Sequence, residues 1–434
     1  MPFFGRLKKA GWMFFEKGIL WRETRRVLVM RIGKWIGIFI VIVILVYGVW
    51  VLVAMNRKAT ISVDYIALLN ETSAAVPEGN RAWPLYREAG IALRKTPEPS
   101  SFSEDIYDDI DTPTWPDQNG WKYYITWIAS HVQTLDTIHR AAAMDSMGYV
   151  LGGTIAVEDK ELWPEQYASQ EDLEQKNDFL FSVLMPHFGP MRAMARLLSI
   201  DAKNAAINGD AESCLSDIET MLAIGTHVRE HPLLIGDLVS FSIYKLAFLT
   251  LGEIMEHDCS LFSIEQMDEL ARVLQGVEKN LTIRFDGERL FFLDLLQRVY
   301  TDDGNGDGSI IPIEGAKMIS QLELVSSSAS SSLVPSLVAP IADMCLASRK
   351  EMLVEFDRRF AFFKKQQLEA HSETTDGNQF VGLPWTPATS TMNPFYLIDI
   401  LTVPSYNSAI EQGVKTRKSR DALLEKIVSK KQPE

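Results

Sequence analysis

Apolar positions recur with a helical period over most of the chain from residue 121 onward. The segments with this period are residues 121–144, 191–207, 211–229, 232–255, 264–277, 342–370 and the tail from residue 406. No region is rich in the apolar–polar alternation that is typical of half-buried strands. The pattern therefore predicts an all-α, mostly helical protein.

Two helix boundaries carry specific local signals. Gly209 can adopt the left-handed conformation that ends a helix, and Asp210 can cap the helix that follows. Residues 191–229 are therefore expected to form an αα-hairpin that resembles one tetratricopeptide unit, although no repeat of about 34 residues recurs along the chain. Ser263 and Gln266 have the spacing of a capping box at the start of the next helix.

A long apolar run lies near the N-terminus. Residues 36–55 contain no charged residue, and a helix of this length spans about 30 Å, the thickness of a hydrocarbon core. The alternative is a cleaved signal peptide. A basic segment of 34 residues precedes the run and no small-residue cleavage site follows it, so we expect an uncleaved transmembrane helix at residues 35–56.

The segment 232–255 is also apolar on nearly all sides, and it is expected to be the buried central helix of the domain. A second membrane span is the minor alternative. It is disfavoured because three charged residues interrupt the segment: Asp237, Lys245 and Glu253.

The charge is distributed unevenly along the chain. The formal net charge of the protein is −14; residues 1–34 carry +7 and residues 35–58 carry +2, which leaves −23 for residues 59–434. The basic end favours an N-terminus in the cytoplasm, with the acidic remainder outside the cell membrane. An acidic domain is a poor ligand for phosphate backbones, so nucleic acid is excluded as a partner.

Composition divides the chain into six parts. They are a basic cytoplasmic segment at 1–34, the membrane helix at 35–56, a stalk and Pro/Asp-rich loop region at 57–120, a helical domain at 121–325, a Ser-rich linker at 326–336 and C-terminal helices at 337–434. Whether the first 30 residues lie as a helix on the inner leaflet or form a basic tail stays open.

An acidic, glycine-rich stretch follows residue 299 and fits the calcium loop of an EF-hand. Aspartate and asparagine occupy positions 1, 3 and 5, glycine occupies position 6, and glutamate occupies position 12, where its carboxylate can bind Ca²⁺ through both oxygens. The predicted ligands are Asp303, Asn305, Asp307, the backbone carbonyl of Ser309, and Glu314.

The remaining positions of this loop agree in part. Gly308 is expected where the chain turns sharply and a side chain would clash, and Ile310 is the apolar residue expected to enter the core. The alternative is a solvated Asp/Gly turn. A single loop favours a structural Ca²⁺ site, or pairing of two loops across a dimer, over a calmodulin-like switch.

A second candidate metal site is the sequence His227-Val-Arg-Glu230-His231, which matches the inverted zincin motif H-x-x-E-H. In such a site two histidines bind zinc and the glutamate activates water. Pro232 follows directly and removes His231 from helical geometry, which favours a polar helix end over a zinc site. No G-x-S-x-G, Walker A or dinucleotide-binding motif is present, so an enzyme is the less favoured class.

The three cysteines, Cys214, Cys259 and Cys345, have no C-x-x-C spacing. They do not predict a zinc knuckle or a disulfide framework. Buried apolar thiols are the favoured interpretation, and a Cys214–Cys259 disulfide is the alternative if this part of the chain lies outside the cytoplasm.

The order of these features resembles a family of single-pass membrane proteins of planctomycete bacteria. The resemblance is carried by the basic end and the span, and then by four segments: NRAWPLYREA (80–89), residues 184–210, HPLLIGDLVSFSI (231–243) and YTDDGNGDG (300–308). It implies the architecture and the Asp-rich loop, and it implies no activity.

Together these features predict a membrane-anchored, extracytoplasmic helical scaffold or interaction protein with one structural Ca²⁺ site. Its expected partners are the lipid bilayer, crossed once, and either another protein or a second copy of the chain. The rival class is a membrane-tethered zinc hydrolase that uses His227, Glu230 and His231.

Overall fold

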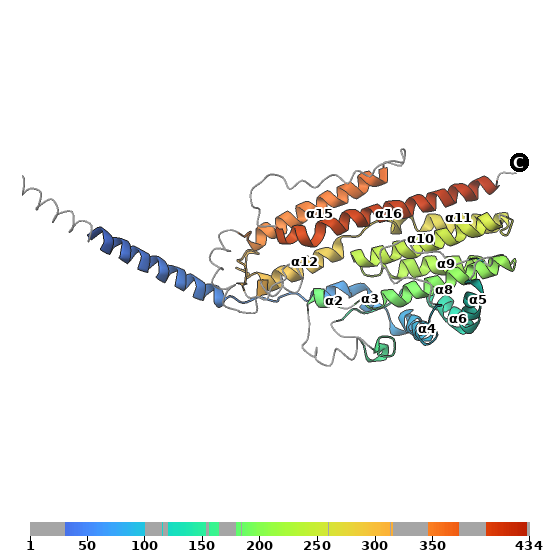
Figure 1. Ribbon diagram of the computed structural model, residues 1–434, viewed down its shortest axis with the longest axis horizontal. Coiled ribbons are helices and arrows are strands. Elements are labelled where there is room, and N and C mark those ends of the chain that lie inside the picture. Colours follow the sequence, from blue (N-terminus) through green and yellow to red (C-terminus); the bar gives the residue numbers. More distant parts are fainter. Residues whose placement is uncertain are drawn as a thin grey trace, which may run out of the picture. The chain divides into compact units, whose positions relative to one another are not determined.

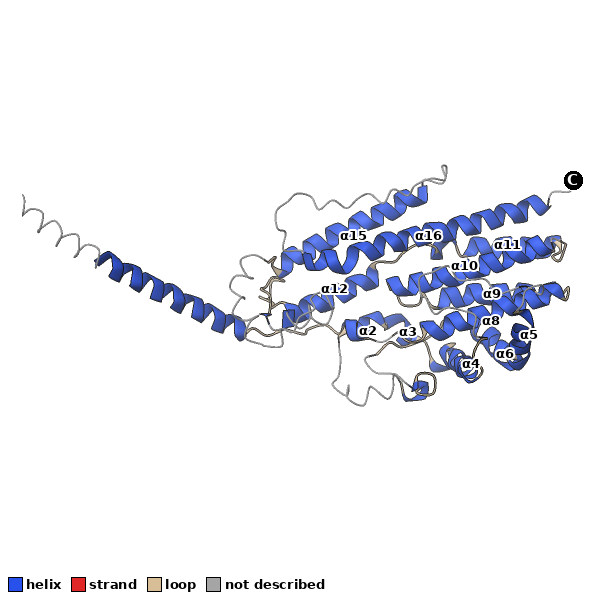
Figure 2. Ribbon diagram, viewed as in Figure 1, coloured by secondary structure: helices blue, strands red, loops and turns tan. Residues whose placement is uncertain are grey.

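The computed structural model of the protein describes residues 31–99, 115, 120–152, 156–164, 179–183, 185–258, 260–312, 314–315, 346–372 and 396–431. Most of these residues are helical (Figure 2). Within them no strand forms, and extended backbone pairs only at two isolated bridges, Arg81 with Ser146 and Tyr300 with Ile310. The predicted all-α class is confirmed.

The chain folds into two compact units, one made of Met1–Ala59 with Val299–Arg349 and the other of Thr60–Arg298 with Lys350–Glu434. We call the first the anchor unit and the second the helical unit. The boundaries of these units differ from the sequence-based division into 121–325 and 337–434. The physical reason is that the C-terminal helices pack on helices that precede residue 299.

The anchor unit contains the helix Arg31–Met55. Its most apolar stretch has a mean hydropathy of 3.1 and is only 6% buried. Its exposed side chains are those of a helix that needs an apolar surrounding: Ile36, Phe39, Ile44 and Leu45 are each at least half exposed. Its length and composition are those found in membrane anchors and in signal sequences.

The helical unit is built from short and long helices in chain order (Figure 1). The first group lies before residue 145: α2 (Tyr65–Leu69), α3 (Glu71–Ala75), η1 (Glu78–Asn80), α4 (Trp83–Lys95), α5 (Trp121–Ser130) and α6 (Val132–Ala142). The second group contains η2 (Val157–Asp159), η4 (Leu180–Ser182), α8 (Phe188–Ile207), α9 (Ala211–His227), α10 (Leu234–His257), α11 (Ile264–Gly276), η5 (Glu278–Asn280), α12 (Asp286–Val299), α15 (Arg349–Ser372) and α16 (Tyr396–Lys431).

Helix α10 is the centre of this unit. It packs against α8, α9 and α16, and Figure 1 shows these helices side by side. The apolar stretch of α10 is 72% buried, and Tyr244, Leu251 and Ile254 are completely enclosed. Although α10 is long and apolar enough to cross a membrane, protein covers it on most sides. It is the buried central helix that the sequence predicts.

The αα-hairpin of α8 and α9 also forms as predicted. Gly209 has φ of +75°, and the side chain of Asp210 accepts a hydrogen bond from the Ser213 N–H at 3.1 Å. Farther along α9, Gly225 has no room for a side chain, because an added Cβ would meet the Tyr244 ring at 2.5 Å. This absence of a side chain lets α9 approach α10 closely.

The capping box at the start of α11 is present. The Ser263 N–H donates to Gln266 Oε1 at 3.0 Å, and the Gln266 N–H donates to Ser263 Oγ at 3.3 Å. The helix boundary at Gly209 and Asp210 and this capping box depend only on neighbouring residues, and both are confirmed.

One expected helix is wrong. Residues 121–144 form two helices, because the chain breaks at His131, whose backbone φ is −117° and ψ is 18°. The ring of His131 packs edge-on against Trp127, with ring centroids 5.5 Å apart, and its Nε2 lies 3.0 Å from the Thr96 carbonyl. A contact distant in sequence thus fixes a residue that local pattern assigns to a helix interior.

The last helices complete the core. Helix α15 packs on α12 through stacked rings of Phe292 and Phe356, whose centroids are 3.8 Å apart, and Tyr406 of α16 contacts Phe360 and Phe363.

Cys214 is completely buried and forms no disulfide, and burial raises the pKa of its thiol to about 12. Cys259, Cys345, the first 30 residues and the Ser-rich linker lie outside the described residues.

Candidate functional site

The predicted calcium loop lies in the anchor unit, where a short hairpin closes it. The Thr301 N–H donates to the Ser309 carbonyl at 3.0 Å, and the Ile311 N–H donates to the Val299 carbonyl at 2.7 Å. Ile310 is 7% exposed, which agrees with the expectation that it enters the core. The hairpin brings the two ends of the acidic stretch together through backbone hydrogen bonds.

Asp303 organises the turn inside this hairpin. Its Oδ1 accepts hydrogen bonds from the backbone N–H groups of Asn305, at 2.8 Å, and Asp307, at 3.0 Å. The Asp303 N–H in turn donates to the Asp307 carbonyl at 2.9 Å. These backbone donors, with that of Asn305 first, hold the pKa of Asp303 below its usual value, so the residue carries a negative charge at neutral pH.

The glycines of the loop have different roles. Positive φ angles occur at Gly304 and Gly306, at +82° and +87°, and not at Gly308, where the sequence predicts the sharp turn. Gly308 is constrained by space instead, because an added Cβ would lie 2.0 Å from the Thr301 carbonyl oxygen. The predicted clash at Gly308 is confirmed, and the turn itself is made by its neighbours.

The predicted ligands do not converge into a metal cage in this structure. Asp303, Asn305 and Glu314 are exposed, and Asp307 and Ser309 are half-buried. Among the described residues, no group of three or more His, Cys, Asp or Glu side chains is arranged to hold a metal ion. The calcium site therefore stays a prediction.

Two arginines of the anchor unit contact this loop. Arg349 forms an ion pair with Asp302, which is not a predicted ligand, and its backbone N–H donates to the Gly308 carbonyl at 3.0 Å. Arg57, just beyond the apolar helix, donates to the Ile310 carbonyl at 2.9 Å. The loop is thereby connected to the chain that leaves the N-terminal helix.

The H-x-x-E-H residues lie in the helical unit, where α9 ends at His227. His231 is outside the helix, as Pro232 predicts. His227 Nδ1 lies 2.8 Å from the Tyr86 hydroxyl and its Nε2 lies 2.9 Å from the Met144 carbonyl. Burial lowers the pKa of His227. Both of its ring nitrogens thus have protein partners.

Glu230 and His231 contact other groups. Glu230 accepts hydrogen bonds from the Ser146 hydroxyl and from the Gly148 N–H, the latter at 2.8 Å. His231 Nε2 lies 3.1 Å from Ser73 Oγ and 3.2 Å from Asn70 Oδ1. The three side chains of the motif therefore bind separate segments that precede α8 to the end of α9 and to the turn that follows it.

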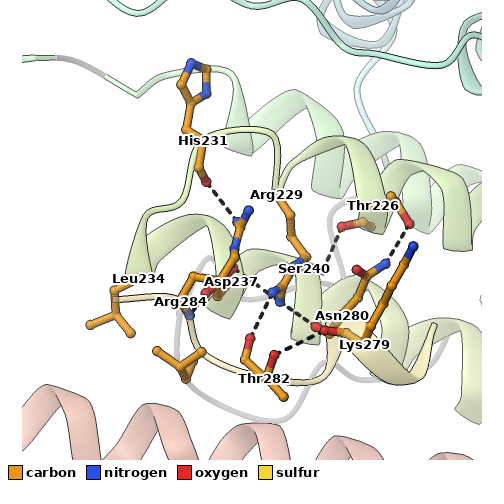
Figure 3. A network of polar contacts seen from close by, with 12 residues as sticks. Thr226, Arg229, His231, Leu234, Asp237, Ser240, Lys279, Asn280, Thr282 and Arg284 are labelled. Carbon is orange, nitrogen blue, oxygen red and sulfur yellow. Dashed lines mark hydrogen bonds and ion pairs between the residues drawn. The ribbon is translucent and has the colours of Figure 1, made fainter. Parts of the chain in front are cut away.

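A buried ionic network lies at the start of α10 (Figure 3). Asp237 is completely buried, and its Oδ1 lies 3.2 Å from Arg229 Nη1 and 2.8 Å from Arg284 Nη2. Arg229 also donates to the carbonyls of Asn280 and Thr282, and Arg284 donates to the His231 carbonyl at 2.9 Å. The network joins the turn after α9, the start of α10 and the segment before α12.

A cavity of about 460 Å³ borders α4, α5 and the first turns of α8. Arg94, Arg192 and Arg196 line it together with Glu98, Trp127 and Trp163. This cavity is not predicted from the sequence. Its only local signal is the spacing of Arg192 and Arg196, four residues apart on one helix, which places both on the same face.

Comparison of the chain with family models, with curated proteins and with solved structures finds no match. Within the helical unit, three of the segments that carry the sequence resemblance do meet. The rings of Trp83 and His187 meet edge-on, with their centroids 6.3 Å apart. An added Cβ on Gly236 would lie 3.6 Å from the Phe188 ring. The resemblance itself stays a prediction.

Proposed function

We propose that this protein is a membrane-anchored scaffold or interaction protein, with its helical unit outside the cytoplasm and one structural Ca²⁺ site in the anchor unit. The surfaces of the helical unit bind a protein partner or a second copy of the chain. The observation that carries the proposal is the contrast between two apolar helices: Arg31–Met55 is 6% buried, and Leu234–His257 is 72% buried.

The orientation is supported by charge. Residues 1–34 carry a net charge of +7, whereas residues 59–434 carry −23. Lys and Arg residues near a span remain on the cytoplasmic side, so the helical unit lies outside. Reporter fusions after Arg57 should be active only outside the cytoplasm. A mature protein that begins near Asn56 would contradict the anchor and indicate a secreted protein.

The calcium site is supported by ligand type and by the existing turn. Carboxylate, amide and backbone oxygens are the ligands that Ca²⁺ prefers, and Asp303, Asn305 and Asp307 already belong to one turn ordered by backbone hydrogen bonds. A loop joined to Arg57 is also well placed to stiffen the chain that leaves the membrane helix.

Metal analysis of the full-length protein, purified in detergent, tests the calcium site. We expect about one Ca²⁺ per chain, lost in Glu314→Gln and in Asp303→Asn. The variant Asp302→Asn is the matched control, because it removes a neighbouring charge at a position that is not a predicted ligand. Zinc in equal amount to protein, lost in His227→Ala, would instead support the zinc hydrolase.

A further inference from the structure

His187, at the start of α8, is enclosed by protein and differs from the other buried histidines. It is 1% exposed, and neither of its ring nitrogens has a hydrogen-bond partner among the described residues. In contrast, a ring nitrogen lies within hydrogen-bond distance of a protein oxygen in His131, His227 and His231. Buried polar groups are nearly always bonded, so the position of His187 suits only an uncharged ring.

Aromatic rings surround the His187 side chain. Its ring centroid lies 4.3 Å from that of Tyr149 and 4.1 Å from that of Phe188. Trp83 meets the same ring edge-on at 6.3 Å between centroids, and Trp163 stacks on Trp83 at 5.9 Å. We call these five residues the aromatic cluster. It connects the start of α4, the segment that follows α6 and the start of α8.

Two backbone hydrogen bonds join the start of α4 to the segment that follows α6. The Ala82 N–H donates to the Ser146 carbonyl at 3.0 Å, and the Trp83 N–H donates to the Met147 carbonyl at 2.8 Å. Both segments also contact the His187 ring. Farther along, α4 packs directly on α8, so a loss of the aromatic cluster would separate only this end of the helix.

A proton on His187 would be placed in unfavourable surroundings. Burial lowers the pKa of His187 well below its usual value, and the positive charge of His231 lowers it further. His187 is also the N-cap residue of α8, at the positive end of the helix dipole. Aromatic faces attract a cation, but this attraction offsets only part of the hydration that a buried, unbonded charge loses. The protonated ring therefore favours an arrangement in which water reaches it.

No neighbouring carboxylate balances this charge through a hydrogen bond to His187. Ionisable side chains on the elements that meet at the aromatic cluster include Arg81, Arg87, Tyr149, Asp159, Arg192, Glu230, His231 and Asp237. Asp159 accepts from the Trp83 indole N–H at 3.2 Å, and Glu230 accepts from the Gly148 N–H at 2.8 Å. Asp237 is paired with two arginines. Each carboxylate thus has a partner other than His187.

We propose that the aromatic cluster is an acid-sensitive contact: when His187 takes up a proton, the start of α4 and the segment after α6 separate from α8, and Trp83 and Tyr149 become exposed. At neutral pH the ring is uncharged and the cluster stays closed. A histidine in contact with water takes up a proton near pH 6.5, so the contact is stable above that pH and opens as the pH falls. The proposal depends neither on the calcium site nor on the membrane anchor.

Hydrogen–deuterium exchange of the full-length protein in detergent tests the proposal, at about pH 7.5 and about pH 5, with rates corrected for the intrinsic effect of pH. The reporters are peptides that contain the Ala82 and Trp83 amides. Their protection should fall by about tenfold to thirtyfold at the lower pH, because protonation of the opened ring favours opening by about that factor. Protection in the middle of α10 should stay the same, and an equal fall there would overturn the proposal.

Three variants assign the effect to His187. His187→Phe keeps an aromatic ring and removes both titratable nitrogens, so it should keep its protection at the lower pH. His187→Leu should do the same and provides a second variant if phenylalanine does not fit. His257→Phe is the matched control, because His257 is exposed at the end of α10, and it should respond to acid like the wild type. Unchanged protection of the wild type in acid, or a wild-type fall in a folded His187 variant, would overturn the proposal.

Discussion

Asp237 in the helical unit and Asp303 in the anchor unit each lie at the centre of a polar cluster, but Asp237 is buried and Asp303 is exposed. Asp237 is completely buried, and two arginines lie within 3.2 Å of its carboxylate. Asp303 is exposed and accepts hydrogen bonds from the backbone N–H groups of Asn305 and Asp307.

The difference lies in the protein groups that surround each carboxylate. Burial raises the pKa of Asp237, and the charges of Arg229 and Arg284 oppose that effect, so the folded chain supplies its own counter-ions. The loop around Asp303 keeps its carboxylates near solvent, where an ion from solution can reach them. Substitution of the buried Asp237 therefore probes the packing of the fold, whereas substitution of an acid of the loop probes the predicted calcium site.

The largest effect is expected for Asp237→Asn. The substitution leaves Arg229, which is 5% exposed, without its counter-ion, and losing one partner of a buried pair costs about 3–5 kcal/mol. Denaturant unfolding of the full-length protein in detergent measures this loss. The control is Asp136→Asn, whose exposed pair with Arg140 should contribute less than about 1 kcal/mol. Equal losses in the two variants would contradict the contrast between buried and exposed acids.

The second effect is the removal of calcium. If the loop binds Ca²⁺, folded protein is stabilised by about 2.7 kcal/mol when the calcium concentration is about 100 times Kd. A chelator should therefore lower the Tm of the wild type, and Glu314→Gln should melt at the same temperature with and without the chelator. Asp302→Asn should keep its response to calcium. Superimposed wild-type curves at millimolar calcium would mean that the loop is only a turn.

The third effect is a change with pH in the free energy of unfolding, and it comes from a histidine of the helical unit. Burial lowers the pKa of His231 to about 4, with Glu230 raising and Arg284 lowering it. Since the unfolded side chain takes up a proton near pH 6.5, stability present above that value is lost as the pH falls, by about 2 kcal/mol between pH 7 and pH 5. His231→Gln should remove this share of the pH dependence of unfolding.

His139 provides the opposite sign. A hydrogen bond with Asp217, at 3.0 Å, raises the pKa of His139, so its contribution is complete at low pH and is lost as the pH rises. His139→Gln should therefore weaken the protein more at pH 5 than at pH 8. A variant at either histidine whose pH profile matches the wild type would show that its surroundings do not shift its titration.

The smallest effect is expected at Asp210, an exposed acid bonded to a backbone N–H like Asp303. It caps α9 through Ser213, and that hydrogen bond lowers its pKa. Asp210→Ala should lower the Tm less than Asp237→Asn or the removal of calcium, and Asp210→Ser should restore it, because serine also caps helices. Neither variant should alter the response to calcium. A calcium-dependent change at Asp210 would show that the ion acts outside the loop.

Much of the helical architecture was predictable from the sequence, because its signals involve residues only a few positions apart. Gly209 and Asp210 end one helix and start the next through contacts with residues at most five positions away. Ser263 and Gln266 form their capping box in the same way. The apolar helix Arg31–Met55 is equally local, because its length and composition are read directly from the chain.

The sites depend on contacts that no local pattern contains. His131, at the break in a predicted helix, lies 3.0 Å from the Thr96 carbonyl, 35 residues away in the chain. The two histidines of the H-x-x-E-H motif contact Asn70 and the Met144 carbonyl, which are also distant in sequence. The arginine-lined cavity joins α4, α5 and α8, and the two arginines that neutralise Asp237 come from different segments. Spacing along one helix is set by backbone geometry, and so the sequence by itself determined the helices, their caps and the acidic loop. Which side chains meet across helices is set by packing, and only the tertiary structure decided that Asp237, His227 and His231 have their partners within the protein.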